Sequence, residues 1–153
     1  MIFENPNSFH NFRLLKGKYM KQSLQFLTLG VKDLNRSKAW YIEKFGWKPF
    51  KDEDGIVFFE MNGFILSLYP VSELAEDIGI PDDGSGFRSF TLAILKKSEA
   101  DVNALFEELE NKGVKIVKAP QKVFWGGYSG YVADPDNNYW EIAYNPFMPA
   151  DDL

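Results

Sequence analysis

The side chains that most often do chemistry in proteins are scarce in this sequence of 153 residues. It contains no cysteine, and His10 is its one histidine. Disulfides, thiolate nucleophiles and cysteine-bound zinc are therefore excluded, and a metal site would rest on oxygen ligands with at most one imidazole. A Ser-His-Asp arrangement would need His10, which stands before the first strand signal, so nucleophilic catalysis of that type is excluded as well.

Glu141 is the strongest candidate for acid–base work or charge recognition. Alternation along the last predicted strand puts Tyr139, Glu141 and Ala143 on one face. A carboxylate among aromatic and small side chains could act as a general base or accept a cationic ligand. The alternative is a structural carboxylate, hydrogen-bonded to a neighbour such as Arg88 or to a backbone amide. Both interpretations stay open.

The elements that position Glu141 occur twice along the chain. In the first half, a strand at 24–31 precedes a helix that Asp33 caps and Gly46 ends. In the second half, a strand at 87–95 precedes a helix that Ser98 opens and that stops before Gly113. Three strands follow each helix, at 47–51, 56–61 and 64–69 and then at 115–118, 128–133 and 139–144, with a short extended piece at 122–125. A turn at 134–138 joins the last two strands.

This duplication predicts an α+β fold of two tandem strand–helix–three-strand modules, which form a cupped mixed sheet around a cleft. We place the modules at 23–70 and 87–146, within one domain of residues 23–148. The acidic stretch 71–86, rich in turn formers, is interpreted as a linker or surface loop. Residues 1–22 form an N-terminal extension, and Met20 is an alternative start to Met1.

Two groups of residues resemble the signatures of the glyoxalase, bleomycin-resistance and extradiol-dioxygenase superfamily, the vicinal oxygen chelate proteins. The opening group is residues 26–34 (FLTLGVKDL), 39–41 (AWY) and 45–47 (FGW), and the closing group is 125–131 (WGGYSGY), 134–136 (DPD) and 140–146 (WEIAYNP). Members that do metal chemistry hold a divalent ion with His, Gln or Glu at four positions. The resemblance places these positions at Phe26, Ser67, Ser89 and Glu141. Since only Glu141 fits, it implies that the usual metal site is gone, and we expect neither metal nor cofactor.

The resemblance also implies a cleft that binds a small, partly apolar and cationic molecule. Aromatic rings and hydroxyls on the cleft side of the strands would line it, together with Glu141. These ligand-binding candidates are Phe26, Thr28, Ser67, Tyr69, Ser89, Trp125, Tyr139 and Glu141. The glycines after Trp125 would allow either a mobile aromatic lid or a bulge between strands.

The composition limits the classes of binding partner that the chain can have. The net charge of −5 argues against nucleic acid, and no apolar run reaches the length of a membrane helix. We expect a cytoplasmic homodimer that binds a small molecule, because members of the superfamily commonly dimerise. The main alternative is an enzyme of the glyoxalase type, a lyase, isomerase or dioxygenase, that works at a rebuilt metal site or through Glu141 as base. A structural dimerisation module is a third alternative.

Overall fold

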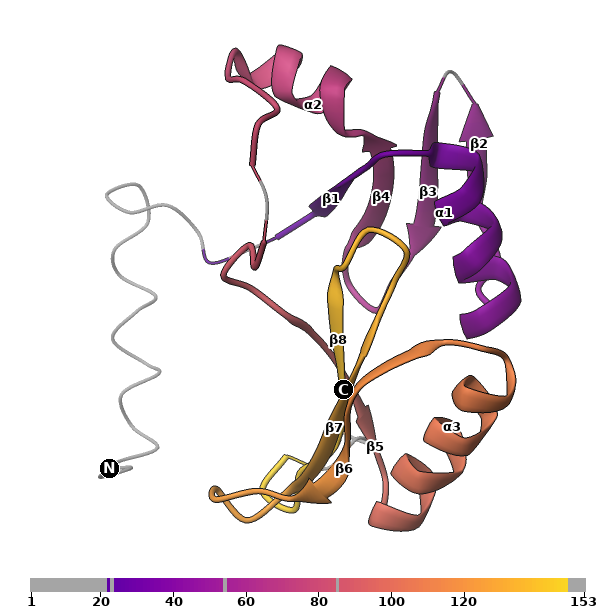
Figure 1. Ribbon diagram of the computed structural model, residues 1–153, viewed down its shortest axis with the longest axis vertical. Coiled ribbons are helices and arrows are strands. Elements are labelled where there is room, and N and C mark those ends of the chain that lie inside the picture. Colours follow the sequence, from indigo (N-terminus) through magenta and orange to yellow (C-terminus); the bar gives the residue numbers. More distant parts are fainter. Residues whose placement is uncertain (1–21, 23, 54, 85, 149–153) are drawn as a thin grey trace, which may run out of the picture.

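Two four-stranded mixed sheets, one from each half of the chain, make up the fold (Figure 1). The computed structural model describes residues 22, 24–53, 55–84 and 86–148. Sheet A has the strand order β1-β4-β3-β2 and sheet B the order β5-β8-β7-β6, and in each the first and last strand of the module pair in parallel. The predicted fold class of two tandem strand–helix–three-strand modules is confirmed, with one separate sheet for each module.

The bounds of the elements follow the chain. The first module contains β1 (Phe26–Val31), α1 (Leu34–Trp40), the π-helical turn η2 (Tyr41–Phe45), β2 (Lys51–Glu53), β3 (Ile56–Glu60) and β4 (Ile65–Pro70). A helix α2 (Val71–Ile78) connects it to the second module, which contains β5 (Leu92–Lys96), α3 (Glu99–Asn111), β6 (Lys115–Lys122), β7 (Tyr128–Ala133) and β8 (Tyr139–Tyr144).

The two predicted helices begin and end at the predicted signals. The Asp33 carboxylate accepts the backbone N–H of Arg36 at 2.9 Å, which satisfies one of the free donors of the first turn. The helical segment ends at Gly46, whose left-handed φ of 70° only glycine adopts without strain. Ser98 caps α3 in the same way as Asp33, since its hydroxyl accepts the N–H of Asp101 at 3.1 Å.

The interpretation of residues 71–86 as a loop is wrong for its first half, because Val71–Ile78 is the helix α2. Its apolar residues recur at three- and four-residue spacing between acidic ones, and Ala75 is buried. A methyl group on Gly30 would lie only 3.1 Å from Val71 and 3.3 Å from Leu74, so α2 packs closely on β1. Burial of that apolar stripe outweighs the turn-forming composition that suggested a loop.

Three strand boundaries also differ from the prediction. The segment predicted as a strand at 47–51 is irregular up to Phe50, because Trp47 turns into the core, and β2 begins at Lys51. Strand β5 begins at Leu92 and not at residue 87. The piece predicted at 115–118 extends to Lys122 as one irregular strand, β6, whose register with β7 shifts twice, and the piece predicted at 122–125 lies mostly in the loop that follows β6.

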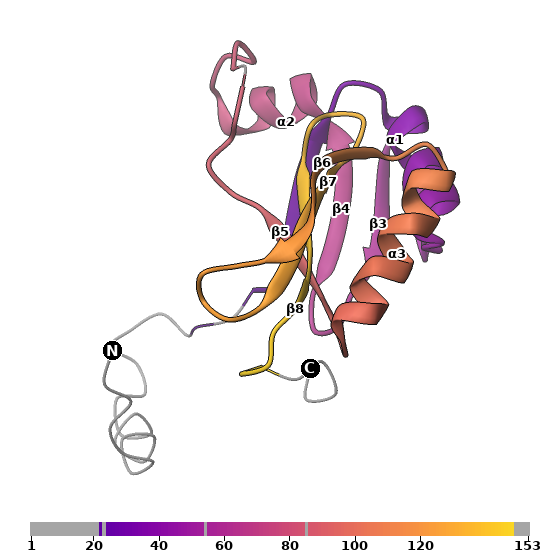
Figure 2. The ribbon, with the colours of Figure 1, turned by 60° about the horizontal axis from the view of Figure 1, so that its bottom comes forward.

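One continuous hydrophobic core joins the two modules. Helices α1 and α3 lie on the same side of the sheets (Figure 2), and apolar side chains from both modules pack there in a single cluster. At its centre Tyr41 is fully buried, 5.5 Å from the ring of Trp47 and 6.0 Å from the ring of Trp140. Among the residues that the structure describes, the faces of the sheets that point away from α1 and α3 carry one helix, α2, which packs at the Gly30 end of β1; we call these the open faces.

The turn between β7 and β8, residues 134–138, carries polar contacts from sheet B to the first module. We call it the inter-module turn. The Asp134 carboxylate accepts the Tyr41 hydroxyl at 2.6 Å, while Asp136 accepts the Lys32 N–H at 3.0 Å and the Ser37 hydroxyl at 2.7 Å. Asn137 has a positive φ of 59°, as the turn requires.

Both oxygens of the Asp134 carboxylate accept hydrogen bonds. One accepts the N–H groups of Asp136 and Asn138, and the other accepts the Asn138 amide and the Tyr41 hydroxyl. Burial, followed by the charge of Asp134, raises the pKa of Tyr41 well above its usual 10.0, so the phenol stays protonated. The 134–136 part of the closing signature therefore joins the two modules.

Candidate functional site

The open face of sheet A carries a row of aromatic rings. Register puts Phe58 opposite Ser67 and Ser67 opposite Thr28, and the hydroxyls of Ser67 and Thr28 are 2.6 Å apart. The Phe58 ring lies 6.0 Å from the ring of Phe26 and 5.9 Å from that of Phe50. Since Phe26 is 52% and Phe50 55% exposed, this face offers apolar surface that could stack against a ligand.

Tyr69 lies on the same face but is tied to α2. A hydrogen bond with Glu73 is the main reason that the pKa of Tyr69 is raised above its usual value. Its register partner on β1 is Gly30, the residue on which Val71 and Leu74 pack. Tyr69, a predicted ligand-binding residue, therefore lies at the edge of the open face, next to helix α2.

Glu141 lies on the open face of sheet B, opposite Ala93 on one side and Tyr131 on the other. It forms a hydrogen bond with Tyr131, and burial, the charge of Glu141 and this bond together raise the pKa of Tyr131 above 10.0. Arg88, which the sequence suggested as a partner, instead donates to the carbonyl of Gly30 at 3.4 Å and to Asn138 at 3.3 Å.

Tyr131 is a functional candidate that sequence reasoning missed. It is five residues before Asp136, and Glu141 is five residues after, so a hairpin centred on Asp136 brings the two side chains opposite each other. That hairpin was predicted, and its register could have identified the pair.

Replacing Glu141 by glutamine should lower the pKa of Tyr131 toward, but not to, its usual value. Loss of the carboxylate removes the charge that opposes phenolate formation, whereas the burial that also raises the pKa remains. Titration of ¹³C-labelled tyrosine rings by NMR between about pH 8 and pH 12 measures this change. Glu110→Gln, an exposed change on α3, is the control and should leave the Tyr131 titration as it is; an unshifted Tyr131 in Glu141→Gln would contradict the contact.

The strand register bears on one of the four positions at which the sequence resemblance implied metal ligands. In sheet A, Phe26 of β1 lies opposite Ile65 of β4, and Ser67 is the second residue after Ile65 on β4. In sheet B, Glu141 follows two residues after Tyr139. Continuing the Leu92–Trp140 register by one residue sets Thr91 opposite Tyr139. Thr91 is thus the counterpart of Phe26, whereas Ser89 lies before β5, exposed, with a positive φ of 64°.

These positions do not fit a divalent metal ion. A phenyl ring, two neutral hydroxyls and one carboxylate, Glu141, offer a single strong oxygen ligand. Over the ranges that the structure describes, no group of three or more His, Cys, Asp and Glu side chains is placed to hold a metal. His10 lies outside the described residues.

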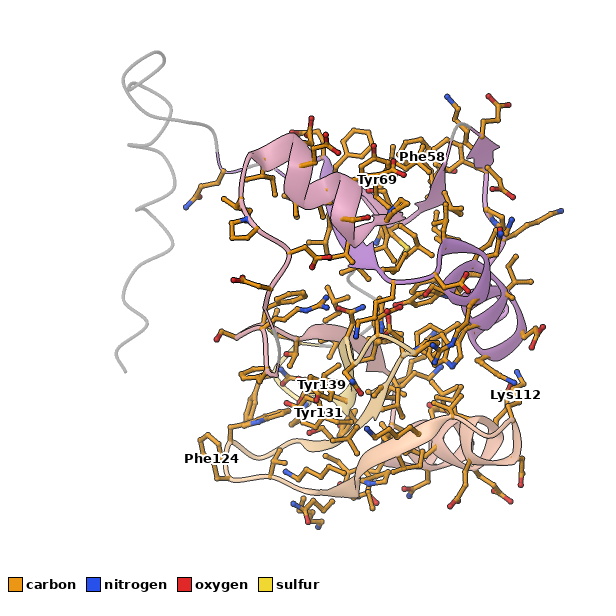
Figure 3. The ribbon with its side chains drawn as sticks, turned by 45° about the horizontal axis from the view of Figure 1, so that its top comes forward. Phe58, Tyr69, Lys112, Phe124, Tyr131 and Tyr139 are labelled. Atoms are coloured by element: carbon orange, nitrogen blue, oxygen red, sulfur yellow. The ribbon has the colours of Figure 1, made fainter. Side chains whose placement is uncertain are left out.

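The other predicted site residue, Trp125, belongs to the loop that joins β6 and β7. Two backbone hydrogen bonds of 3.0 Å between Val123 and the glycines Gly126 and Gly127 close this loop. The Trp125 ring folds over Gly127 so closely that any side chain there would overlap it. The two glycines therefore allow this hairpin loop to turn tightly. The neighbouring Phe124 is fully exposed at its tip (Figure 3).

The predicted ligand-binding residues thus form two groups within one chain. Phe26, Thr28, Ser67 and Tyr69 belong to sheet A, and Tyr139 and Glu141 to sheet B. Figure 3 shows Phe58 and Tyr69 at one sheet and Tyr131 and Tyr139 at the other. Ser89 and Trp125 lie outside the strands of both sheets.

Fold and sequence together define the family. The chain belongs to the glyoxalase/bleomycin resistance protein/dioxygenase superfamily, whose sequence profile matches residues 23–142. A glyoxalase-related enzyme from Fulvimarina pelagi is 39% identical and superimposes with a TM-score of 0.75, over 84% of this chain and 92% of the other. A glyoxalase/bleomycin resistance protein/dioxygenase from Nocardioides shares the fold with a TM-score of 0.75 at 22% identity, over 90% and 91% of the two chains.

A second relative is also similar in sequence. Metallothiol transferase FosB from Lysinibacillus sphaericus is 27% identical over 121 residues, which are 79% of this chain and 81% of that protein. A lactoylglutathione lyase from Agrobacterium tumefaciens has the same fold, with a TM-score of 0.66 at 21% identity over 84% and 97% of the two chains. None of the helices in the described part of the chain is long and apolar enough to cross a membrane.

Proposed function

We propose that this protein is a metal-independent, small-molecule-binding member of the superfamily. The observation that carries the proposal is the set of side chains at the metal-binding register positions, where Glu141 is the one strong oxygen ligand and Phe26 cannot coordinate a cation at all. A ring at that position instead extends the aromatic surface of Phe58 and Phe50.

The ligand class follows from the same residues. Aromatic faces attract organic cations through their negative π-surface, with a contribution of about 0.5–2 kcal/mol for each contact. Glu141 adds a carboxylate, held by Tyr131, on the open face of the other sheet. A partly apolar organic cation, such as a substituted ammonium, therefore suits the two faces together.

A homodimer would bring the two faces into one site. The exposed phenyl rings on sheet A and the carboxylate on sheet B belong to separate groups in one chain. In a dimer, sheet A of one copy and sheet B of the other would face each other and form the two walls of one cleft. The dimer, the domain bounds of 23–148 and a cytoplasmic location remain predictions.

Isothermal titration with benzyltrimethylammonium, and with benzyl alcohol as the neutral aromatic, tests this proposal. We expect saturable binding of the cation that Glu141→Gln weakens at least about five-fold, because the carboxylate and the quaternary ammonium, which has no N–H to donate, attract each other by about 1–4 kcal/mol at about 4 Å. Glu110→Gln on α3 is the matched control and should bind like the unmodified protein. Equal affinity in both variants would contradict a role for Glu141.

A metal-dependent enzyme is the second candidate. The similarity to a metallothiol transferase supports it, as does the pairing of Glu141 with a tyrosine, which resembles acid–base pairs in active sites. Elemental analysis of protein purified without a chelating tag separates the candidates. A stoichiometric transition metal that is lost in Glu141→Ala would favour the enzyme and refute the metal-independent proposal.

A further inference from the structure

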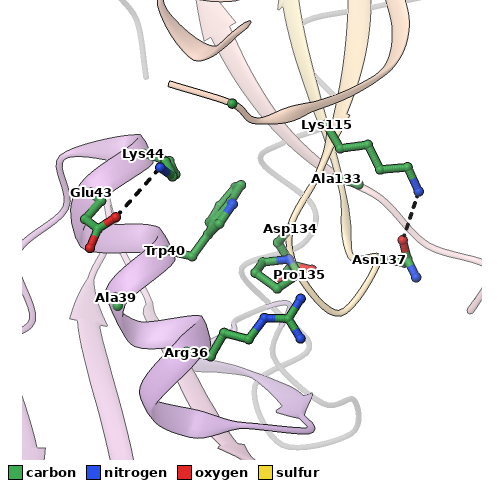
Figure 4. A pocket seen from close by; sticks show the side chains of 11 residues that line it. Arg36, Ala39, Trp40, Glu43, Lys44, Lys115, Ala133, Asp134, Pro135 and Asn137 are labelled. Carbon is green, nitrogen blue, oxygen red and sulfur yellow. Dashed lines mark hydrogen bonds and ion pairs between the residues drawn. The ribbon is translucent and has the colours of Figure 1, made fainter. Parts of the chain in front are cut away.

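A pocket of about 480 Å³ lies on the helix side of the molecule, away from the open faces of the sheets (Figure 4). One wall is the exposed side of α1 and η2, and the other is the inter-module turn with the start of β6. Arg36, Trp40 and Lys44 come from the first module, and Lys115, Pro135 and Asn137 from the second. Anything bound here contacts both modules.

The lining of the pocket has three cations and two carboxylates, an excess of one positive charge, although the chain as a whole has a net charge of −5. Arg36, Lys44 and Lys115 surround it, against the carboxylates Glu43 and Asp134. The charge of Asp134 is already met by four hydrogen bonds, and Glu43 lies 3.7 Å from Lys44. Within the described ranges, the Arg36 guanidinium has neither a hydrogen-bond nor an ion-pair partner.

An aromatic platform stands among these cations. Figure 4 shows the Trp40 side chain extending from α1 between Lys44 and Arg36, with Pro135 across the pocket. The indole packs against the rings of Tyr41 and Phe45, at centroid distances of 4.9 Å and 4.8 Å. A ring fixed in this way offers a rigid surface for stacking.

The backbone at this place is unusual as well. The residues directly after Trp40, Tyr41–Phe45, form a π-helix. Short π-helical turns are rare and occur frequently at functional sites. Glu43 and Lys44, which line the pocket, belong to this turn. The irregular turn is thus a second observation, independent of charge, that singles out the same location.

From these observations we infer that the pocket is a second binding site, for a small anion that carries a planar ring, such as an aryl phosphate or aryl carboxylate. The ring stacks on Trp40, and the anionic group lies within reach of Arg36 and the lysines at the rim. The site does not involve Glu141 or the aromatic row of sheet A, so it stands independently of the proposed function.

NMR titration of the ¹⁵N-labelled full chain tests the inference, with phenyl phosphate, benzoate and inorganic phosphate as probes. We expect saturable shifts of the Trp40 indole N–H and of amides in residues 36–44, 113–115 and 133–137. Phenyl phosphate should bind at least about five-fold more tightly than inorganic phosphate, because stacking adds about 1 kcal/mol. Comparison of phenyl phosphate with benzoate decides which anion the site prefers. Shifts confined to the open faces of the sheets, or equal affinity for inorganic phosphate, would overturn the inference.

Paired variants of exposed charges make the test specific. Arg36→Gln should weaken binding of phenyl phosphate about three- to ten-fold, whereas Glu43→Gln should strengthen it by a few-fold, because one removes a cation and the other an anion from the pocket. Both effects should shrink in high salt. Lys118→Gln on β6 is the matched control and should change nothing. If Arg36→Gln and Glu43→Gln change the affinity for phenyl phosphate in the same direction, or not at all, the inferred binding site is refuted.

Discussion

Replacing Asp134 by asparagine should lower the free energy of unfolding by about 3 kcal/mol. Asp134 is 3% exposed, and its carboxylate accepts four hydrogen bonds, two from backbone N–H groups, one from the Asn138 amide and one from the Tyr41 hydroxyl. An asparagine side chain keeps only one acceptor oxygen. Its NH₂ group, itself a donor, would replace a carboxylate oxygen that now accepts two hydrogen bonds. The Tyr41 hydroxyl also accepts the indole N–H of Trp140 at 3.1 Å, so the disturbance extends into the core.

Urea denaturation followed by tryptophan fluorescence measures this loss. For a protein of this size, about 3 kcal/mol corresponds to a fall in the melting temperature of about 6–12 °C. Asp82→Asn changes an exposed aspartate in the segment after α2 and is the control, with an expected effect within about 0.5 kcal/mol. A loss below about 1 kcal/mol in Asp134→Asn would mean that the buried carboxylate contributes little.

Gly130→Ala should cost about 3 kcal/mol, at the upper end of what an added methyl group costs in a packed interior. A methyl group there would lie 2.6 Å from the Phe106 ring, 2.7 Å from the Lys118 carbonyl oxygen and 2.9 Å from the Pro120 nitrogen. Two of these three contacts are with backbone atoms, which cannot turn aside. They are so close because β6 shifts register between Lys118 and Gln121, opposite Gly130.

The matched control is Gly84→Ala, at a position where a methyl group would meet nothing within 4 Å and φ is not in the left-handed region. This change should leave stability unaltered or raise it slightly, by about 0.4–1 kcal/mol. Thermal unfolding of the two variants side by side checks the pair. Similar melting temperatures for Gly130→Ala and Gly84→Ala would show that β6 can move away from β7 at little cost.

The fold could be predicted well from local signals. Asp33, Gly46 and Ser98 are at the helix ends that the sequence indicated, and the strands 128–133 and 139–144 have the predicted bounds. These signals are short-range, and each uses a distinct chemical property of one residue. The helix α2 was missed because its stability depends on packing against Gly30 of β1, a tertiary contact that composition does not reveal.

The candidate site was predicted less completely. Period-two alternation placed Glu141 on the open face, as observed, but Ser89 was assigned to a strand that begins only at Leu92. A shift in where a strand begins changes which residue meets a given partner, and the sequence alone carries no signal for that boundary. The pocket beside Trp40 could not be predicted either, since it is formed by two modules whose relative position depends on the inter-module turn.

The inter-module turn has a consequence for how the chain folds. Its hydrogen bonds join residues that are 93, 99 and 104 positions apart in sequence, so they require almost the whole domain to be in place. Contacts of such long range close late, after the strands within each half have paired. We therefore expect the loss of stability in Asp134→Asn to appear mainly as faster unfolding, with a nearly unchanged refolding arm of the chevron plot. A refolding rate that falls in proportion to the lost stability would instead place the turn in the folding nucleus.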